Sequence, residues 1–271
     1  MTPGLVLNQA LTFLPGPTMP LAHPSVHALL LVALAGVYAG AQNVLAGGGS
    51  FITFPALLLA GLNPLAANIS STIALFPSQI TSAFAGRRLV GSVGALRFRH
   101  LLLLSLAGGV VGALLLLSTP AEFFARLVPW LVLFATSVFA WGSFRRKPLG
   151  AAASLPTPVL LVVQGGIAIY GGYFGGGIGF LMLAALTVAG QAVRTATATK
   201  NALAMAMNAS AVVVFVFSPQ VSWPAVLALG TGGVLGGLTG SWLMHRLPEK
   251  ILRGFVVCVG CALTVWLFLR Q

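Results

Sequence analysis

Eight long apolar segments, each close to 20 residues, constrain the fold of this 271-residue chain more than any other feature. An α-helix needs about 20 mostly apolar residues to cross the hydrocarbon core of a bilayer. Only 6% of the residues are charged, against about 25% in soluble domains. We therefore predict an all-α polytopic membrane protein with eight full spans. They lie near 25–46, 66–86, 100–118, 127–144, 158–175, 196–217, 223–244 and 254–269.

Two shorter apolar pieces, 51–62 and 180–190, follow glycine-rich runs. At about 1.5 Å per residue they reach only part of the way through a bilayer, so we expect two short or re-entrant helices. A shift of 129 residues places Phe51 on Phe180 and the polar run 70–72 on 199–201. The chain therefore divides into two homologous repeats. The predicted units are an irregular tail (1–24), repeat one (25–147), a linker (148–157) and repeat two (158–271).

The basic residues bear on the relative orientation of the repeats. If the short pieces dip in and return, the repeats run parallel, with eight cations on the inner side and five on the outer. If each short piece completes a crossing, the repeats are inverted and eleven of the fourteen Lys and Arg face inward. Cytoplasmic loops are rich in Lys and Arg, so this distribution favours inverted repeats. The same bias explains the net charge of +12, and no nucleic-acid partner is expected.

Lys200 places a full positive charge inside the span at 196–217. A charge near the bilayer centre costs at least about 2.5–3.5 kcal/mol, and such residues usually mark a substrate path. The alternative is an ammonium that extends to the headgroups. The only acids, Glu122 and Glu249, lie in loops. The missing carboxylates argue against a proton or cation pump and favour an anion as the ligand of Lys200.

Polar residues around Lys200, and at the equivalent place in repeat one, complete a candidate substrate site. Each cluster begins a long helix, where Asn68 and Thr195 can act as N-caps. Ammonium, amide and hydroxyl donors suit an oxyanion or a carboxylate. Glycine breaks would add backbone N–H groups at the start of short helices, although small residues also serve close helix packing. The candidate binding residues are Asn68, Ser70, Ser71, Thr72, Thr199, Lys200, Asn201, Gly48, Gly49, Gly176 and Gly177.

Gln79 and Asn208 pair under the same shift and lie about two helical turns beyond these clusters. They are candidates for the substrate pathway, and a structural hydrogen bond between helices is the alternative role. The sequence has no Walker A motif, no HExxH and no plausible catalytic triad within the membrane. Cys258 and Cys261 share an apolar helix without other metal ligands. We therefore expect no enzyme activity, no catalytic residue, no metal and no cofactor.

The run Gly47-Gly-Gly-Ser-Phe-Ile-Thr-Phe-Pro-Ala-Leu57 continues through Gly61-Leu-Asn-Pro64 to Ala67-Asn-Ile-Ser-Ser-Thr72. With Gly171-Gly-Tyr-Phe-Gly-Gly-Gly-Ile-Gly-Phe180 and 196–201, it resembles the TauE/SafE sulfite-exporter family, whose motif occurs in both halves. The resemblance covers nearly the whole chain. It implies a secondary permease for sulfite, sulfonates or related small anions in the cytoplasmic membrane. Ala184, Val193 and Lys200 depart from the pattern, so the family's substrate transfers only as a class.

The residues and the resemblance together predict a secondary transporter that moves a small anion, such as sulfite, a sulfonate or another organosulfur compound. Alternating access around a midplane site is the expected mechanism. The expected partners are the anionic substrate and the lipid bilayer, and a homodimer is left open. Two broken short helices also suit a passive anion channel. A membrane assembly factor without transport activity is the alternative from a different class.

Overall fold

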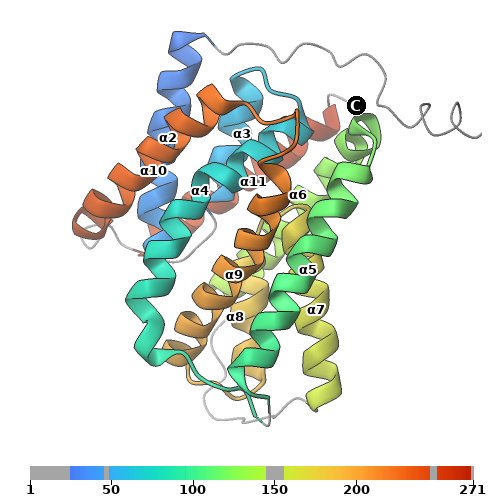
Figure 1. Ribbon diagram of the computed structural model, residues 1–271. Coiled ribbons are helices and arrows are strands. Elements are labelled where there is room, and N and C mark those ends of the chain that lie inside the picture. Colours follow the sequence, from blue (N-terminus) through green and yellow to red (C-terminus); the bar gives the residue numbers. More distant parts are fainter. Residues whose placement is uncertain (1–24, 46–48, 95, 145–155, 245–248, 270–271) are drawn as a thin grey trace, which may run out of the picture.

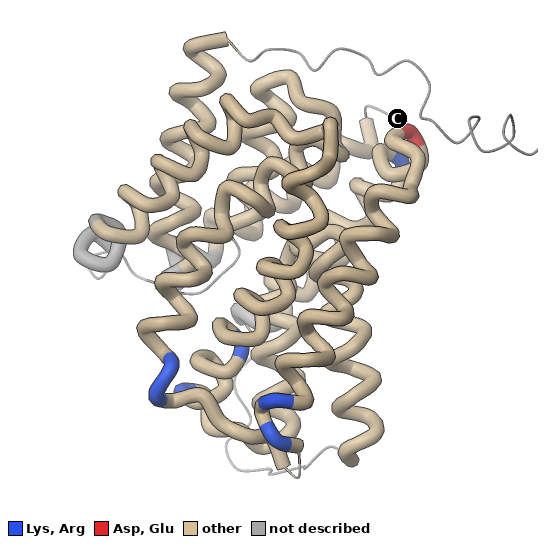
Figure 2. The backbone as a smooth tube through the Cα atoms, in the orientation of Figure 1, with Lys and Arg blue, Asp and Glu red and all other residues tan. Residues whose placement is uncertain are grey.

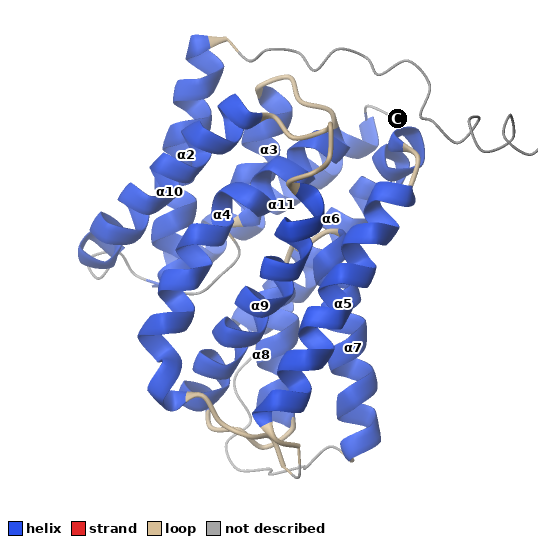
Figure 3. Ribbon diagram, in the orientation of Figure 1, coloured by secondary structure: helices blue, strands red, loops and turns tan. Residues whose placement is uncertain are grey.

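The computed structural model describes residues 25–45, 49–94, 96–144, 156–244 and 249–269. These residues form ten α-helices and one 3₁₀-helix, without a β-strand among them (Figure 3). The all-α prediction is therefore confirmed for this part of the chain, whereas the predicted tail and most of the predicted linker lie outside it. The helices are α2 (Val26–Leu45), α3 (Ser50–Leu59), α4 (Pro64–Gly86), η1 (Arg87–Leu89), α5 (Phe98–Ser118), α6 (Ala121–Phe144), α7 (Thr157–Tyr173), α8 (Ile178–Val188), α9 (Val193–Phe215), α10 (Trp223–Met244) and α11 (Glu249–Leu269).

The eight long helices correspond one to one to the apolar segments predicted as spans. In the described part of the chain, three stretches are both long and apolar enough to cross a membrane: Val26–Asn43, Phe98–Ser118 and Ala121–Trp141. α4 and α9 have 23 residues each, about 34 Å of helix, which exceeds a hydrocarbon core of about 30 Å. Their lower hydropathy comes from the polar residues of the candidate site. α6 starts at Ala121, earlier than predicted, with Glu122 in its first turn. A carboxylate there interacts favourably with the positive end of the helix dipole.

α3 and α8 are the two short helices, and they end in the same way. In α3 the N–H of Leu62 donates to the carbonyl of Leu57, and in α8 the N–H of Gln191 donates to the carbonyl of Leu186. This six-to-one bond defines a Schellman C-cap, which needs a left-handed residue just before the donor. Gly61 (φ 92°) and Gly190 (φ 93°) supply it. Each glycine thus stops a helix part of the way through the bundle.

The start of α4 corrects one expectation. Asn63 is the N-cap, because its Oδ1 accepts from the N–H of Ala66 at 2.8 Å, and Pro64 follows at the first helical position. α9 begins at Val193 after Ala192, without a side-chain cap. Asn68 and Thr195 are therefore not N-caps, and the polar residues that follow them lie deeper in the helices than the sequence suggested.

Glycines allow two pairs of helices to pack with their backbones in contact. α2 lies beside α10, and α5 lies beside α7 (Figure 1). A Cβ atom at Gly236 would collide with the backbone of Val37 in α2, and one at Gly112 would collide with the backbone of α7. Small residues that bring backbones together are typical of helix pairs in membranes. Gly112 and Gly236 therefore serve close packing between helices.

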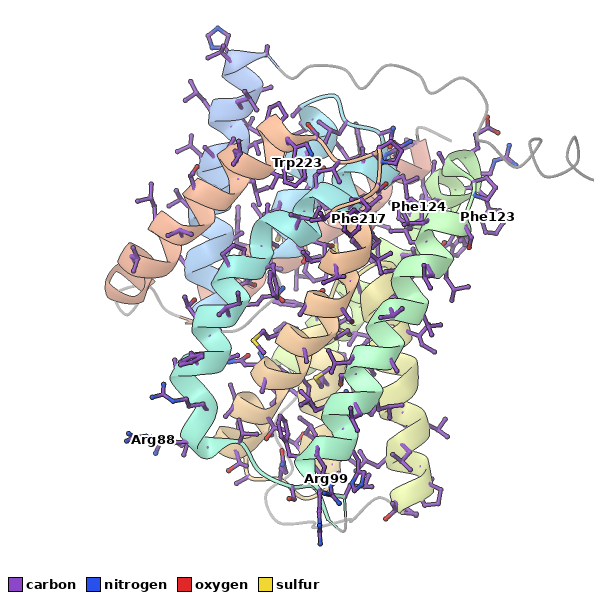
Figure 4. All side chains as sticks on the ribbon, viewed as in Figure 1. Arg88, Arg99, Phe123, Phe124, Phe217 and Trp223 are labelled. Atoms are coloured by element: carbon purple, nitrogen blue, oxygen red, sulfur yellow. The ribbon has the colours of Figure 1, made fainter. Side chains whose placement is uncertain are left out.

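The connecting loops and the charges divide between two ends of the bundle. α4 descends from the upper end in Figure 1, and α9 rises from the lower end. Arg88 and Arg99 lie at the lower end, whereas Phe217 and Trp223 lie at the upper end (Figure 4). Most of the described Lys and Arg gather at the lower end (Figure 2). The loop after α4 and the loop after α9 are thus on opposite sides of the bundle.

Candidate functional site

Lys200 lies two turns into α9 and is buried, with only 5% of its surface exposed. Among the residues that the structure describes, it forms no hydrogen bond and no ion pair. Glu122 is in the first turn of α6, next to Phe123 at the upper end (Figure 4), and Glu249 is the first residue of α11. α9 rises from the lower end, so Lys200 is in the lower half of the bundle. A buried ammonium without a partner is costly, and this one is open to a ligand from its pocket.

The pocket around Lys200, called here the Lys200 pocket, lies where α4 and α9 meet the broken region before α8. It encloses about 530 Å³, its mouth included. Four of its lining residues come from the predicted site and pathway: Lys200, Asn201 and Gln79 with their side chains, and Gly177 with its backbone. Its lining residues are Asn43, Ser50, Gln79, Ser82, Gly175, Gly177, Ile178, Gly179, Lys200, Asn201 and Ala204.

The first turn of α8 faces the ammonium. A Cβ atom placed on Gly179 would lie 3.7 Å from Nζ of Lys200. Gly177, the N-cap, provides no side-chain hydrogen bond to this helix start. The N–H of Phe180 donates to the carbonyl of Gly177 at 3.0 Å, whereas the N–H groups of Ile178 and Gly179 come before the first intrahelical acceptor. Such a helix start attracts anions through these N–H groups and the helix dipole. The lysine charge and the helix start therefore act on the same volume.

Left-handed glycines produce the break between α7 and α8. Gly175 has φ 78° and Gly177 has φ 75°, a conformation that costs other L-residues about 1–2 kcal/mol. The hydroxyl of Tyr170 donates to the carbonyl of Gly176 at 2.9 Å. That bond satisfies a carbonyl that the broken helix would otherwise leave unpaired within the membrane. The break expected over the glycine run 171–177 is therefore a turn at 175–177 that orients α8, while Gly171 and Gly172 belong to α7.

The break before α3 is organised by a residue that the sequence reasoning missed. Oδ1 of Asn43 accepts from the N–H of Gly49 at 3.0 Å, and Nδ2 of Asn43 donates to Ser78 at 3.5 Å. Gly49 is buried, while Gly48 lies outside the described residues. Asn43 and Ser50 are polar residues on either side of the glycine run 47–49. This pattern could have identified both of them from the sequence. For Ser82 the available signal was its place three residues after Gln79 on α4, which puts both on the same face of the helix.

A second pocket, called here the Asn68 pocket, holds the polar cluster of repeat one. Ser71 shares a hydrogen bond of 2.7 Å with Thr53 of α3, and the hydroxyl of Thr72 donates to the carbonyl of Asn68 at 2.9 Å. Nδ2 of Asn68 donates to the carbonyl of Tyr173 at 3.0 Å. These groups are thus engaged with protein. The lining residues are Ser50, Phe51, Phe54, Asn68, Ser71, Thr72, Val132, Phe174, Gly176 and Leu263.

Ser70 and Thr199 point away from both pockets and hold loops in place. Oγ of Ser70 accepts from the N–H of Ser222 at 3.0 Å, after α9. Oγ1 of Thr199 accepts from the N–H of Gly91 at 3.2 Å, after α4. Each hydroxyl therefore ties a helix of one half to a loop of the other. Neither residue lines the Lys200 pocket or the Asn68 pocket.

Gln79 and Asn208 form a hydrogen bond between α4 and α9. Nδ2 of Asn208 donates to Oε1 of Gln79 at 2.8 Å, and the two residues are 129 positions apart. The structural role that was the alternative for this pair is thus observed. Gln79 also lines the Lys200 pocket, where its amide N–H groups remain available, whereas Asn208 is buried beyond it.

The Lys200 pocket therefore offers hydrogen-bond donors and the positive charge of Lys200 to a ligand. No described side chain that lines it is a carboxylate. The ammonium of Lys200 and the amides of Asn201 and Gln79 are charged or neutral hydrogen-bond donors, and charge-assisted bonds to an anion are the strong ones. The chemistry that fits is reversible binding of a small anion. The groups give no nucleophile paired with a base, and in the described residues no three His, Cys, Asp or Glu cluster to hold a metal.

Comparisons with known proteins identify the family of this chain. The family model described as "Sulfite exporter TauE/SafE" matches residues 32–267. A protein of Sinorhizobium sp. named "Probable membrane transporter protein ORF9" is 32% identical over 241 residues, which cover 88% of this chain and 92% of that protein. "Probable membrane transporter protein YfcA" of Escherichia coli is 27% identical over 228 residues, covering 83% and 84%. A "Probable membrane transporter protein" of Haemophilus influenzae is 25% identical over 242 residues, covering 87% and 92%.

The family match spans nearly all described helices, and the relatives are aligned over most of their own length. The expected resemblance is therefore confirmed, as are a multi-pass membrane protein and a transporter rather than an enzyme. The chain belongs to the TauE/SafE sulfite exporter family of membrane transport proteins.

Proposed function

We propose that this protein is a secondary transporter that carries a small sulfur-containing anion, such as sulfite or a sulfonate, across the cytoplasmic membrane. The observation that carries the proposal is the unpartnered ammonium of Lys200 beside the open first turn of α8. At 4 Å, two unit charges attract by about 4 kcal/mol at an effective dielectric constant of 20. Desolvation offsets part of this energy, and the remainder suits a substrate that must bind and then leave.

Two inverted repeats, 25–147 and 158–271, are the architecture that we propose for alternating access. Three observations support it: the matching C-caps of α3 and α8, the loop ties made by Ser70 and Thr199, and the Gln79–Asn208 bond between residues 129 apart. The helix packing has the same symmetry, because α2 with α10 corresponds to α7 with α5. In transporters built this way, short helices converge on a site at the repeat interface.

The lower end of the bundle, which carries Arg87, Arg88, Arg97 and Arg99, is the side that we assign to the cytoplasm. Basic residues in short loops set this orientation in most membrane proteins. The names of the relatives as probable membrane transporters favour transport over an assembly role. Saturable flux with counterflow would distinguish a carrier from a channel.

Flux in proteoliposomes tests the proposal. The Lys200→Met variant removes the charge and keeps most of the side-chain volume. Arg194→Met is the matched control, because it removes one positive charge from the exposed start of the same helix. We expect at least about a tenfold loss of saturable sulfite or methanesulfonate flux for Lys200→Met, and near-parental flux for the control. Parental flux in a folded Lys200→Met protein would refute the site.

A further inference from the structure

We propose that a groove between α4 and α10 binds an acyl chain of an anionic phospholipid, whose phosphate group is held by Arg87 and Arg88. This site, called here the α4–α10 groove, is on the outer surface of the bundle and shares no lining residue with the Lys200 pocket. It does not depend on which anion the protein carries. The lipid belongs to the leaflet at the lower end of the bundle.

The α4–α10 groove is large and open to the side. It encloses about 1060 Å³, its open side included, against about 530 Å³ for the Lys200 pocket. Its floor contains the buried residues Ile73, Ala74 and Val226. At its rim, Leu227 is 65% exposed and Leu235 is 57% exposed. A buried floor with an exposed apolar rim forms a channel on the surface that faces the bilayer.

The lining of the α4–α10 groove has no side-chain donor in need of water. Thr231 is the polar side chain among its described lining residues, and its hydroxyl donates to the carbonyls of Leu227 and Ala228 at 2.8 and 3.0 Å. Gly230 leaves the floor low, because a Cβ atom there would lie 3.5 Å from the carbonyl oxygen of Ala74. Apolar walls without contact atoms lose dispersion energy. A hydrocarbon chain is therefore the occupant that fits.

An exposed stripe on α4 leads from the groove to two arginines. Thr81 follows Pro77 by four residues and Phe84 follows Thr81 by three, a spacing that puts them on one helix face, and all three are exposed. Arg88 comes four residues after Phe84, at the lower end of α4 (Figure 4). The guanidinium of Arg87 is 4.9 Å from the centroid of the Phe84 ring and donates to the Phe84 carbonyl at 3.2 Å. Both cations are thus at the end of this stripe.

The distance from the arginines to the groove matches one leaflet. Ten residues separate Pro77 from Arg87, about 15 Å of helix, and half of a hydrocarbon core of about 30 Å is equally thick. A lipid with its phosphate beside the arginines therefore has the end of its acyl chain at the groove. Guanidinium groups suit phosphate oxygens, and the only acids of the chain, Glu122 and Glu249, belong to α6 and α11.

A second copy of the chain is the other occupant to consider for an apolar groove in a membrane. A two-fold dimer centred on the groove would use the same surface of both subunits. Groove would then face groove, and the volume would stay empty. A lipid fills the volume and contacts both α4 and α10, which come from different halves of the chain, so its binding should stabilise the protein.

Lipid titration tests the headgroup site, with native mass spectrometry and thermal melting as readouts. Dioleoyl phosphatidylglycerol should bind about 25-fold more tightly than dioleoyl phosphatidylcholine and raise Tm further, because each arginine near an anionic headgroup contributes about fivefold. The double variant Arg87→Gln, Arg88→Gln should bring the two lipids level. Arg97→Gln, Arg99→Gln is the matched control, since both arginines are exposed at the same end, and it should keep the preference. Equal binding of the two lipids by the parent, or an unchanged preference in the Arg87, Arg88 variant, would overturn the inference.

Cross-linking tests the acyl-chain site. Phosphatidylglycerol with a diazirine in the outer half of one acyl chain should label α4 and α10 of the parent protein. Thr231→Phe, which fills the groove from its exposed rim, should reduce this labelling several-fold. Val162→Phe at a position 75% exposed on α7 should not. Labels spread evenly over the outward-facing helices of the parent would overturn the inference, whether or not the variant folds. A dimer that Thr231→Phe dissociates without a change in labelling would assign the groove to a second copy.

Discussion

Alanine at Gly177 and at Gly179 should have opposite effects on stability, although only Ile178 separates the two positions and both line the Lys200 pocket. Gly177 has φ 75°, and a Cβ atom there would lie 3.3 Å from the backbone and Cβ of Ala135 in α6. Gly179 is inside α8 in ordinary helical conformation, and its Cβ would be 3.7 Å from Nζ of Lys200. The same added methyl group therefore tests backbone strain at one site and occupancy of the anion volume at the other.

The expected magnitudes follow from these geometries. Left-handed backbone costs an L-residue about 1–2 kcal/mol, and the tight approach to Ala135 adds to it, so Gly177→Ala should destabilise the protein by about 2 kcal/mol. In a chain of this size, each kcal/mol shifts Tm by roughly 2–4 °C, which predicts a loss of about 4–8 °C. Gly179→Ala should raise stability by about 0.4–1 kcal/mol, because Gly179 is not among the positive-φ glycines and alanine lowers the conformational entropy of the unfolded chain. The methyl group beside the ammonium should nevertheless weaken anion binding several-fold.

Thermal melting in detergent and anion competition measure both quantities on the same samples. Gly166→Ala is the control, because that helical glycine in α7 has open space around its Cβ position. This substitution should also raise the stability of the protein, and it should leave anion binding unchanged. A Gly177→Ala protein as stable as the parent would show that the left-handed turn is not required. A Gly179→Ala protein with parental affinity would show that the anion does not bind beside Lys200.

Two further predictions concern the arrangement of the halves. A double-mutant cycle with Gln79→Leu and Asn208→Leu should give a coupling of about 0.6 kcal/mol, the mean for hydrogen bonds between membrane helices; additive effects in thermal melts would contradict the bond. Single cysteines at Ser92 and Gln220, in a background without the two native cysteines, should react with an impermeant thiol reagent from opposite sides of the membrane, as the positions of the two loops require (Figure 4). Labelling of both from one side would refute inverted repeats.

The sequence indicated the architecture because the bilayer makes composition decisive. A segment of 20 apolar residues has few alternatives to a spanning helix, so the eight long helices follow from hydropathy. Gly61 and Gly190 also marked the ends of α3 and α8, since left-handed C-caps need glycine. Helix starts were harder to predict: Asn63 is the cap of α4, and residues deeper in the helix were offered for that role.

The candidate site was only partly accessible from the sequence. Lys200 was identifiable by itself, because a charge in an apolar helix is expensive wherever the helix packs. Its polar neighbours were not, since consecutive helical residues point about 100° apart. Ser70, Ser71 and Thr72 accordingly face a loop, Thr53 and their own helix.

The amino-acid sequence thus determined the class of protein, the approximate positions of its helices and breaks, and Lys200 as a cation within a helix. Only the tertiary structure decided what surrounds that cation. It brought Asn43, Ser50 and Gln79 from α2, α3 and α4 to the same pocket as Lys200 and the start of α8. It also separated the polar cluster of repeat one into a second, aromatic chamber. The physical reason is that hydropathy depends on local composition, whereas a binding site depends on which helix faces meet, and that depends on packing among all the helices.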